Sequence, residues 1–331
     1  MKKKLKIEWM LERGHDVRQH ADLIKLLDVN NFNSILIRTA SFFPDPWAIA
    51  NHYASLSNNI KFLVAVNPSM VSPIYCAIQV STFQKLFGDR ISINVVSGAS
   101  KVEQEALGDY SPIEDRYKRS AEFASILKTL VINGKLDLFN GEFYKIKNAE
   151  IEQGHDFELV FAGSSDNTIN LANKFGSVHY YAMESSDQYL ESRKKIMVES
   201  AIKATIIVEE TSSLAWDYAN KLLKLATPER IDELKKDLLS HESENQKRQQ
   251  VLHNFSKENL KVEDNIWAGM GLLRGGGVTA MVGDYQEIAN LIEKFYNSGL
   301  DRILIGGTPE LYYANNFING VIPILKDKKI I

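Results

Sequence analysis

The amino-acid sequence predicts an α/β fold in which eight parallel strands close into a TIM, or (β/α)8, barrel. Short runs rich in Val, Ile and Phe alternate along the chain with segments of helical spacing, which is typical of repeated βα units. The runs are almost continuously apolar, so both faces of the predicted sheet should be covered. Eight such runs fit a closed barrel better than an open doubly wound sheet, which usually has about five to seven strands.

The order of elements follows from these runs. Pro residues near the starts of the helical segments and Gly residues near their ends are typical helix boundaries. We expect the helices to include 45–58, 72–88, 113–131 and 284–299. All residues, 1–331, should form a single domain. The eight strands are expected at 5–11, 34–39, 61–66, 91–97, 157–163, 178–183, 204–209 and 302–307.

Two segments depart from the βα rhythm. Residues 132–156 contain Asn-Gly twice between short alternating runs, which predicts a small hairpin before the fifth strand. Residues 211–283 form a much longer insertion after the seventh strand, with helical spacing at 212–226 and 228–252. Active-site lids lie at the carboxyl end of a barrel, so we expect this insertion to supply one.

The composition excludes several classes of protein. With 44% apolar and 24% charged residues and a net charge of −3, the chain lacks the basic field that nucleic-acid binding requires. No apolar run approaches the roughly 20 residues of a membrane span, and no signal peptide is evident, so we expect a cytoplasmic protein. The single cysteine, Cys76, rules out an internal disulfide. The seven histidines show no metal-ligand spacing, and we expect no metal site.

The predicted loops after the strands are where a TIM-barrel site should form. After the second strand come Phe43 and Trp47, and after the fifth strand Gly163, Ser164 and Ser165 lead into a helix. Small and hydroxyl residues that open a helix expose N–H groups, and these bind phosphate well. The alternative is that one of the serines only caps the helix.

Lys203 and Thr205 are two residues apart at the seventh strand, so both should point to the same face. If that face is the barrel interior, the lysine needs an anion or a carboxylate beside it. The alternative is that Lys203 precedes the strand and is solvated.

The stretch LLRGGGVTAMVGD, residues 272–284, places Arg274 before three glycines, Gly275, Gly276 and Gly277. Flexible glycines let a backbone close over a bound anion while a guanidinium supplies two parallel hydrogen bonds. A tight bend with a surface arginine is the alternative. The glycines do not follow a strand directly, so they are no dinucleotide-binding motif.

Several of these segments also resemble one known family. The matching stretches are FLVAVNPSMVSP (62–73), 83–98, DRYKRSAEF (115–123), VFAGSSD (160–166), 265–284 and GLDRILIGGTPEL (299–311). From the second strand onward, the chain resembles the bacterial-luciferase-like flavin-dependent monooxygenases, and most of all their alkanesulfonate monooxygenase branch. The resemblance implies a TIM barrel with an extended lid, reduced FMN delivered by a separate NAD(P)H:flavin reductase, and O2 as the oxidant.

The resemblance also implies roles for single residues. The flavin would lie against Ala65 and Val66, where the family has a non-prolyl cis peptide. Arg274 would sit on a mobile loop that closes on an anion or on the oxygenated flavin and excludes water. For Tyr117, as for Trp47, core packing is the alternative. Further flavin contacts would come from Asn94, Val96, Ser97 and Tyr117, with Gly163, Ser164 and Ser165 at the phosphate.

The chain departs from the sulfonate branch at positions of the substrate side. Thr205 stands where that branch has a histidine, and a threonine cannot act as acid or base near neutral pH. Lys203 replaces an arginine and keeps the positive charge. We therefore do not expect a simple alkanesulfonate as substrate. The other replacements are Phe43 for a cysteine, Met183 for a tryptophan and Thr308 for a tyrosine.

These observations give one leading hypothesis and two alternatives. The first is a two-component monooxygenase that uses FMNH2 and O2 on a small organic substrate such as a biosynthetic intermediate, working as a homodimer or homotetramer. The alternatives are a flavin-binding homologue that has lost catalysis and a deazaflavin-dependent oxidoreductase. Trp47, Lys203, Thr205 and Arg274 would line the substrate side. An enzyme should bring Lys203, Thr205 and Arg274 to one cavity above the flavin, whereas a homologue without catalysis need not.

Overall fold

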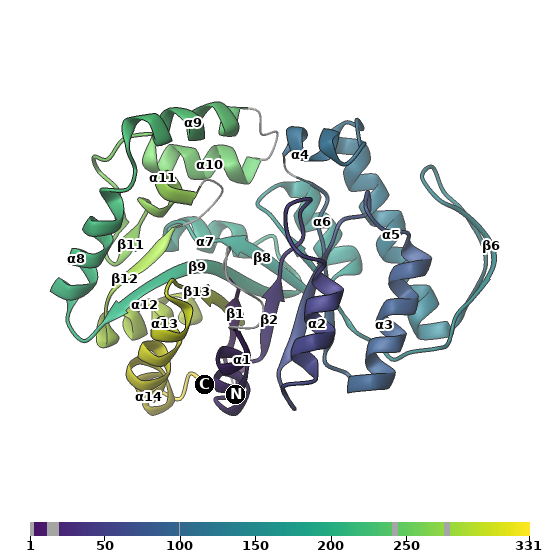
Figure 1. Cartoon of the computed structure of the whole chain (residues 1–331), viewed down its shortest axis with the longest axis horizontal. Coiled ribbons are helices and arrows are strands. Elements are labelled where there is room, and N and C mark those ends of the chain that lie inside the picture. The colour runs from purple at the N-terminus through teal and green to yellow at the C-terminus, as the bar shows by residue number, and fades with distance from the viewer. Residues whose placement is uncertain (1–2, 12–19, 99, 240–243, 275–278) are drawn as a thin grey trace.

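The eight predicted strands form a closed parallel barrel. The computed structural model describes residues 3–11, 20–98, 100–239, 244–274 and 279–331. Around the barrel each strand pairs with the next, and the last pairs again with the first, which confirms the predicted TIM barrel (Figure 1). In spatial order its strands are β1 (Lys6–Met10), β2 (Ser34–Ile37), β3 (Lys61–Val66), β4 (Ile91–Val95), β7 (Glu158–Ala162), β8 (Val178–Ala182), β9 (Glu199–Glu209) and β13 (Arg302–Gly306).

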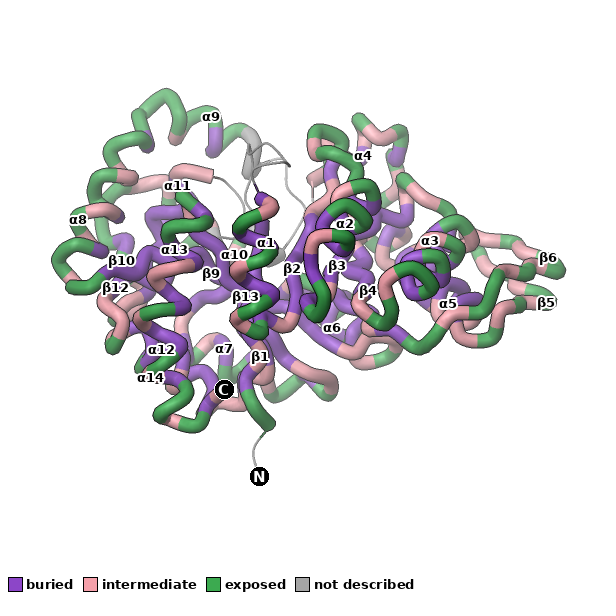
Figure 2. Tube along the Cα trace, turned by 60° about the horizontal axis from the view of Figure 1, so that its bottom comes forward, coloured by how far each residue is buried: buried purple, intermediate pink, exposed green. Residues whose placement is uncertain are grey.

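Helices cover the outside of the barrel, and their buried faces point inward (Figure 2). Side chains cap the starts of several of them. Asp284 forms a capping box with Glu287 at the start of α12. The helices are α1 (Ala21–Val29), α2 (Pro46–Ala54), α3 (Pro73–Phe87), α4 (Lys101–Ala106), α5 (Ile113–Asn133), α6 (Asp166–Phe175), α7 (Ser186–Arg193), α12 (Tyr285–Asn297), α13 (Glu310–Asn316), a π turn (Phe317–Val321) and α14 (Ile322–Asp327).

The interior of the barrel has two layers. At the amino-terminal ends of the strands, the guanidinium of Arg302, only 2% exposed, forms ion pairs with Glu8, Glu158 and Glu199. Towards the carboxyl ends the interior becomes apolar, and it includes Leu36, Leu63, Val160, Tyr180 and Leu304. Because the two layers fill the lower barrel, a ligand can enter only from the carboxyl rim.

The predicted hairpin insertion is present before the fifth barrel strand. β5 (Lys135–Asn140) and β6 (Lys145–Glu150) pair antiparallel and extend away from the barrel wall (Figure 1). The carboxylate of Glu122 on α5 accepts hydrogen bonds from the backbone N–H groups of residues 142, 143 and 144 at the tip, at 2.7–3.0 Å. This one side chain therefore holds the turn of the hairpin against α5.

The long insertion lies between β9 and α12, over the carboxyl side of the barrel (Figure 1). Of the segment 228–252, for which helical spacing was predicted, the structure describes one helix before and one helix after residues 240–243, which lie outside the described residues. The insertion consists of α8 (Ser212–Leu223), α9 (Pro228–Leu239), α10 (Glu244–His253), β10 (Lys261–Glu263), β11 (Ile266–Trp267), α11 (Met270–Arg274) and β12 (Ala280–Asp284).

β9 is longer than predicted, and it has a neighbour that the sequence did not reveal. It begins at Glu199 rather than at 204, because polar residues on its inner face interrupt the apolar run. Its far half pairs in parallel with β12, with Ala280 opposite Thr205. The insertion is therefore joined to the barrel by backbone hydrogen bonds. In the part of the chain that the structure describes, we find no helix both long and apolar enough to cross a membrane.

Candidate active site

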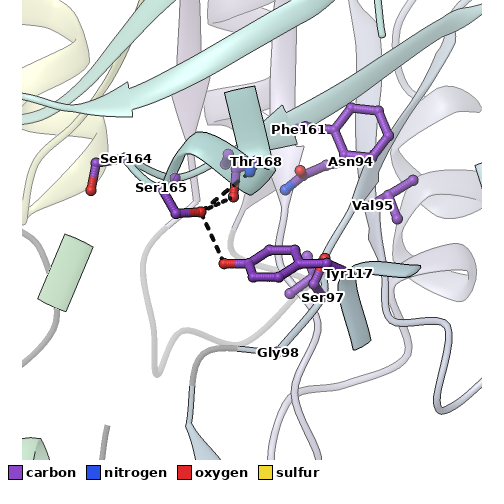
Figure 3. A pocket seen from close by; sticks show the side chains of 12 residues that line it. Asn94, Val95, Ser97, Gly98, Tyr117, Phe161, Ser164, Ser165 and Thr168 are labelled. Carbon is purple, nitrogen blue, oxygen red and sulfur yellow. Dashed lines mark hydrogen bonds between the residues drawn. The ribbon is translucent and has the colours of Figure 1, made fainter. Parts of the chain in front are cut away.

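A cavity of about 110 Å³, which we call the rim cavity, opens where β4, β7 and the start of α6 meet (Figure 3). It is lined by seven of the nine residues expected to hold a flavin cofactor, although these come from three separate parts of the chain. The seven are Asn94, Val96, Ser97, Tyr117, Gly163, Ser164 and Ser165.

The turn from β7 into α6 is built around Ser165. Its Oγ accepts a hydrogen bond from the backbone N–H of Thr168 at 3.2 Å, so it is the N-cap that the sequence left open. The same oxygen lies 2.9 Å from the Thr168 hydroxyl and 3.0 Å from the hydroxyl of Tyr117 (Figure 3). Tyr117 thus contacts the site through its hydroxyl group and does not only fill the core.

Gly163 is required by the backbone of this turn. Its φ of +148° lies in a region that L side chains rarely adopt, and an added Cβ would come within 3.0 Å of the Thr168 hydroxyl oxygen. The first N–H groups of an α-helix have no acceptor within the helix, and at the start of α6 the side chain of Ser165 accepts a hydrogen bond from the N–H of Thr168. The carboxylate of Asp166, in the first turn of α6, forms an ion pair with Lys195 at 2.9 Å.

Two polar atoms of the rim cavity are buried without a hydrogen-bond partner, namely the hydroxyl of Ser164 and the side-chain oxygen of Asn94. Buried polar atoms are normally satisfied, because leaving one unpaired costs about 1–3 kcal/mol. Together with the helix start, they provide donors and acceptors for a phosphorylated ligand. The residues present therefore fit the phosphate end of a nucleotide cofactor.

A second cavity of about 270 Å³, the central cavity, lies at the barrel mouth and shares Asn94, Val96 and Ala162 with the rim cavity. Leu36, Leu63, Ala65, Tyr180 and Leu304 line it from the barrel interior. Taken together, the two cavities reach the lower end of the roughly 300–1,000 Å³ typical of small-molecule sites.

The expectations for Ala65 and Val66 are met only in part. Ala65 lines the central cavity, whereas Val66 faces the opposite side of β3 and packs in the core behind it, because successive strand residues alternate. The expected cis peptide at these residues is absent. Among the described residues the one cis bond is Thr308–Pro309. A trans bond there agrees with the general preference of about 2.5–4 kcal/mol for non-prolyl peptides.

Lys203 points into the barrel, which is the first of the two alternatives that the sequence left open. It lines the central cavity, two residues after the interior Ala201. Thr205 continues the same face but is 2% exposed, and its hydroxyl is buried without a hydrogen-bond partner. Trp47 lies on α2 within the hydrophobic core and lines none of the cavities described here. Of these three predicted substrate-side residues, only Lys203 reaches the central cavity.

Arg274 does not line the central cavity. It ends α11, its guanidinium donates to the hydroxyl of Thr308 at 3.0 Å, and it lines a third cavity formed with the insertion. The expected convergence of Arg274 with Lys203 and Thr205 on one cavity is therefore not observed, because α11 directs the arginine to the turn after β13. Its three neighbours Gly275, Gly276 and Gly277 lie outside the described residues.

Two charged residues of the central cavity were not predicted. Arg38 lines it, donates to the carbonyl of Leu11 at 3.0 Å and lies over the ring of Phe43 at 5.1 Å. It belongs to the predicted strand 34–39, and the alternation from the interior Leu36 would have placed it inward. Glu103 reaches the cavity from α4, and no sequence pattern indicated this.

The electrostatics of the barrel mouth favour anions. Among the residues that the structure describes, the charged side chains that line the central cavity are the cations Lys203 and Arg38 and the carboxylate Glu103. Below them, burial raises the pKa of Tyr180 far above its ordinary value, so its hydroxyl stays protonated and donates to Glu8. Among the described residues that line the rim and central cavities there is no histidine. Within the described ranges, no three His, Cys, Asp or Glu side chains are grouped to hold a metal ion.

The fold and these cavities define a TIM-barrel protein that can hold a phosphorylated cofactor at its carboxyl rim. The family model described as luciferase-like monooxygenase matches residues 6–302. The chain belongs to this family, as its sequence resemblance implied, and it is a flavin-dependent monooxygenase by class.

Several solved structures share this fold. EDTA monooxygenase (EmoA) from Chelativorans sp. BNC1 is 16% identical with a TM-score of 0.79, covering 99% of this chain and 95% of its own. Long-chain alkane monooxygenase (LadA) is 15% identical with a TM-score of 0.78, covering 100% and 93%. An F420-dependent secondary alcohol dehydrogenase is 15% identical with a TM-score of 0.69, covering 96% and 98%. At these identities the likeness shows the fold alone.

Proposed function

We propose that the protein is the oxygenating component of a two-component system, which binds FMNH2 from a separate NAD(P)H:flavin reductase and uses O2 to oxygenate a small organic substrate. One observation carries the proposal. The turn from Gly163 to Ser165, with Tyr117 and the unpaired polar atoms of Ser164 and Asn94, forms a cavity suited to a phosphate at the start of α6.

The flavin ring would occupy the central cavity, because that cavity continues from the rim cavity through Asn94, Val96 and Ala162. The small side chain of Ala65 would leave room for a planar ring there, and Ser97, which follows β4, would hold the cofactor from the rim cavity. When bound, reduced FMN supplies the electrons for oxygen activation. Val66 would contribute only through its backbone, because its side chain faces the core.

On the substrate side, we assign Lys203 to hold an anionic group of the flavin or of the substrate, since its cation lies inside the barrel mouth. The buried hydroxyl of Thr205 would position a neighbouring polar group and not move a proton. Trp47 would support the site by packing from α2. Arg274 would contact the substrate from α11 of the insertion. Phe43 adds an apolar ring to the central cavity, and we still do not expect a simple alkanesulfonate as substrate; Met183 is buried in the core and lines none of the three cavities.

Oligomerisation as a homodimer or homotetramer, the reductase as a transient partner and a cytoplasmic location remain part of the proposal. Relatives with this fold include monooxygenases and an F420-dependent dehydrogenase, so the cofactor itself must be tested. The rim cavity favours FMN, whose single phosphate matches the one helix start there.

Calorimetric titrations of the purified chain with FMN, riboflavin and F420 test the cofactor. We expect FMN to bind at least about tenfold more tightly than riboflavin, because riboflavin lacks the phosphate. Equal affinity for the two would contradict the phosphate site, and tighter binding of F420 would favour a deazaflavin enzyme. Reduced FMN and O2 are then supplied with candidate substrates. A protein that binds FMN but only releases peroxide with each of them would be a homologue without oxygenase activity.

A further inference from the structure

One wall of the rim cavity is the backbone that follows β4, at Ser97 and Gly98 (Figure 3). Gly98 has a φ of +84°, which L side chains rarely adopt, and a Cβ added there would lie 2.3 Å from Cδ of Gln104. The backbone at Gly98 therefore rests directly on the side-chain amide of Gln104. In the part of the chain that the structure describes, Gln104 does not itself line the rim cavity, so it supports this wall from behind.

The side chain of Gln104 is held in place by the loop after β3. Gln104 lies on α4 and is 1% exposed, and its Oε1 accepts a hydrogen bond from Nδ2 of Asn67 at 3.2 Å. Asn67 is itself buried, and its Oδ1 accepts from the backbone N–H of Ser69 at 2.9 Å. These bonds fix the amide of Gln104 against Gly98, and so join the loop after β3 to the loop after β4.

An ion pair anchors this arrangement to α5. The hydroxyl of Ser69 donates to the carboxylate of Asp109 at 2.6 Å and accepts from Arg119 at 2.8 Å. Asp109 and Arg119 form an ion pair whose side chains are 5% and 15% exposed. Burial disfavours the charged carboxylate, but the hydrogen bonds from Arg119 and Ser69 outweigh this effect and hold the pKa of Asp109 well below its ordinary value. The anchor is therefore charged at neutral pH, and it lies on the same helix as Tyr117, which contacts the site.

Packing alone does not require a glutamine at position 104. The Nε2 atom of Gln104 is buried without a hydrogen-bond partner among the residues that the structure describes. Buried polar atoms are normally satisfied, because an unpaired one destabilises the fold. A leucine or a methionine would fill a similar volume without this cost. The amide therefore indicates that a fixed position is needed behind Gly98, and not only a filled space.

We propose that Gln104 is a positioning residue of the flavin site: by supporting the backbone at Gly98, it sets the width of the rim cavity around the phosphate end of the cofactor. Gln104 acts through Ser97 and Gly98 and does not touch the cofactor. This inference rests on the proposed binding of FMN at the start of α6. The rim cavity has only about 110 Å³, so a small shift of one wall should affect the phosphorylated ligand most.

The substitution Gln104→Met tests this role, because it keeps a similar volume and removes the hydrogen bonds of the amide. Titrations of the full chain with FMN and with riboflavin give the ratio of the two dissociation constants. We expect the variant to lose about fivefold or more of the wild-type preference for FMN, whereas a purely structural role would weaken both ligands equally. An unchanged ratio would overturn the proposal. A wild-type chain without any preference for FMN would instead refute the phosphate site itself, and this role with it.

Gln84→Met is the matched control. Gln84 is also a buried glutamine, and its amide forms two hydrogen bonds with the backbone of His155, at 2.9 and 3.1 Å. It lies on α3, and it is not among the described residues that line the rim cavity. This variant should be less stable in urea and keep the wild-type ratio. The same change of ratio in both variants would refute a specific role of Gln104.

Gly98→Ala tests the contact between the two residues. The added methyl group should press on the amide of Gln104 and weaken FMN binding, and Gln104→Ala removes the atoms that it meets. The double variant should therefore bind FMN at least about twofold more tightly than the product of the two single losses predicts. Losses that simply multiply would show that the two residues act independently, and would contradict the support on which the proposal depends.

Discussion

Gly163 shows how one backbone angle determines the candidate cofactor site. Its φ of +148° turns the chain from β7 into α6, and a methyl group there would press on Thr168 at 3.0 Å. The substitution Gly163→Ala should therefore lower FMN affinity by at least about tenfold, because strained backbone conformations cost about 1–3 kcal/mol. Fluorescence titration with FMN measures this effect.

Gly88 provides the control for that experiment. It also has a positive φ, +76°, but nothing lies within 4 Å of an added Cβ, and it ends α3 away from the rim cavity. Gly88→Ala should reduce stability and leave FMN affinity within about twofold of the wild type. If both variants lose FMN to the same extent, the effect of Gly163→Ala reports general destabilisation and not the site.

Substitutions of the two neighbouring serines should distinguish an effect on FMN binding from an effect on folding stability. The hydroxyl of Ser164 is buried without a partner, so Ser164→Ala should weaken FMN binding by about tenfold while riboflavin binding stays the same. The hydroxyl of Ser165 caps α6, so Ser165→Ala should also lower the free energy of unfolding by about 1 kcal/mol. Paired FMN titrations and urea unfolding curves distinguish the two roles. A Ser164 variant that loses riboflavin and FMN alike would contradict the phosphate assignment.

Single residues also show what the sequence could and could not predict. The direction of Lys203 followed from strand alternation, which is a local rule. The same rule also places Arg38 inward, two residues after the interior Leu36, although Arg38 was not among the predicted site residues. The location of Arg274 depends on how the insertion packs over β13, a contact between residues 34 positions apart in sequence. No local pattern encodes that distance.

At the scale of elements, prediction succeeded where a pattern is repeated and failed where an element depends on a distant neighbour. The barrel strands and the hairpin follow from apolar runs and Asn-Gly turns. β12 is a strand because it pairs with the far half of β9, and β9 extends to Glu199 because its inner polar residues face an interior that accepts charge. The insertion was placed correctly, but its internal order could not be predicted.

The hairpin depends on one carboxylate. Glu122 accepts three backbone hydrogen bonds from the turn between β5 and β6, and charge-assisted bonds of this kind contribute about 1.5–3 kcal/mol each. Glu122→Ala should therefore speed amide hydrogen exchange throughout 135–150, while FMN affinity stays unchanged. Exchange measured by mass spectrometry tests this. Glu114→Ala, at an exposed position on the same helix, should leave the exchange of the hairpin as it is.

For the molecule as a whole, the closed barrel explains why one end is sealed and why a ligand should bind at the other end. Arg302 holds three carboxylates of three strands in the lower barrel, so this end is sealed by charge pairs and the ligand must bind at the opposite rim. Topology alone brings together the carboxyl ends of β4 and β7, where Val95 lies opposite Phe161, 66 residues further along the chain. The sequence therefore predicts which loops meet, whereas the division of the rim into separate cavities depends on side-chain packing.

Stability of the whole chain should decline in mild acid. Burial lowers the pKa of His179 and of His253 to about 4, from about 6.5 in an unfolded chain. Between these values the unfolded chain binds protons that the folded chain excludes, so stability is full above about pH 6.5 and is lost as the pH falls towards 4. Each histidine should contribute a loss of about 2 kcal/mol between pH 7 and pH 5.

Urea unfolding at the two pH values, followed by circular dichroism, measures this loss. His179→Leu and His253→Leu replace the titrating ring by an apolar group of similar size, so each should reduce the difference in unfolding free energy between pH 7 and pH 5, whatever its effect at either pH. His52 is exposed on α2, and His52→Leu should keep the wild-type difference. An undiminished difference in both buried variants would contradict the assignment of the acid sensitivity to these histidines. The carboxylate of Glu199 beside Arg302 is not the cause, because its pKa is lowered to about 2 and its stabilising charge is lost only as the pH falls below the ordinary carboxylate pKa of about 4.5.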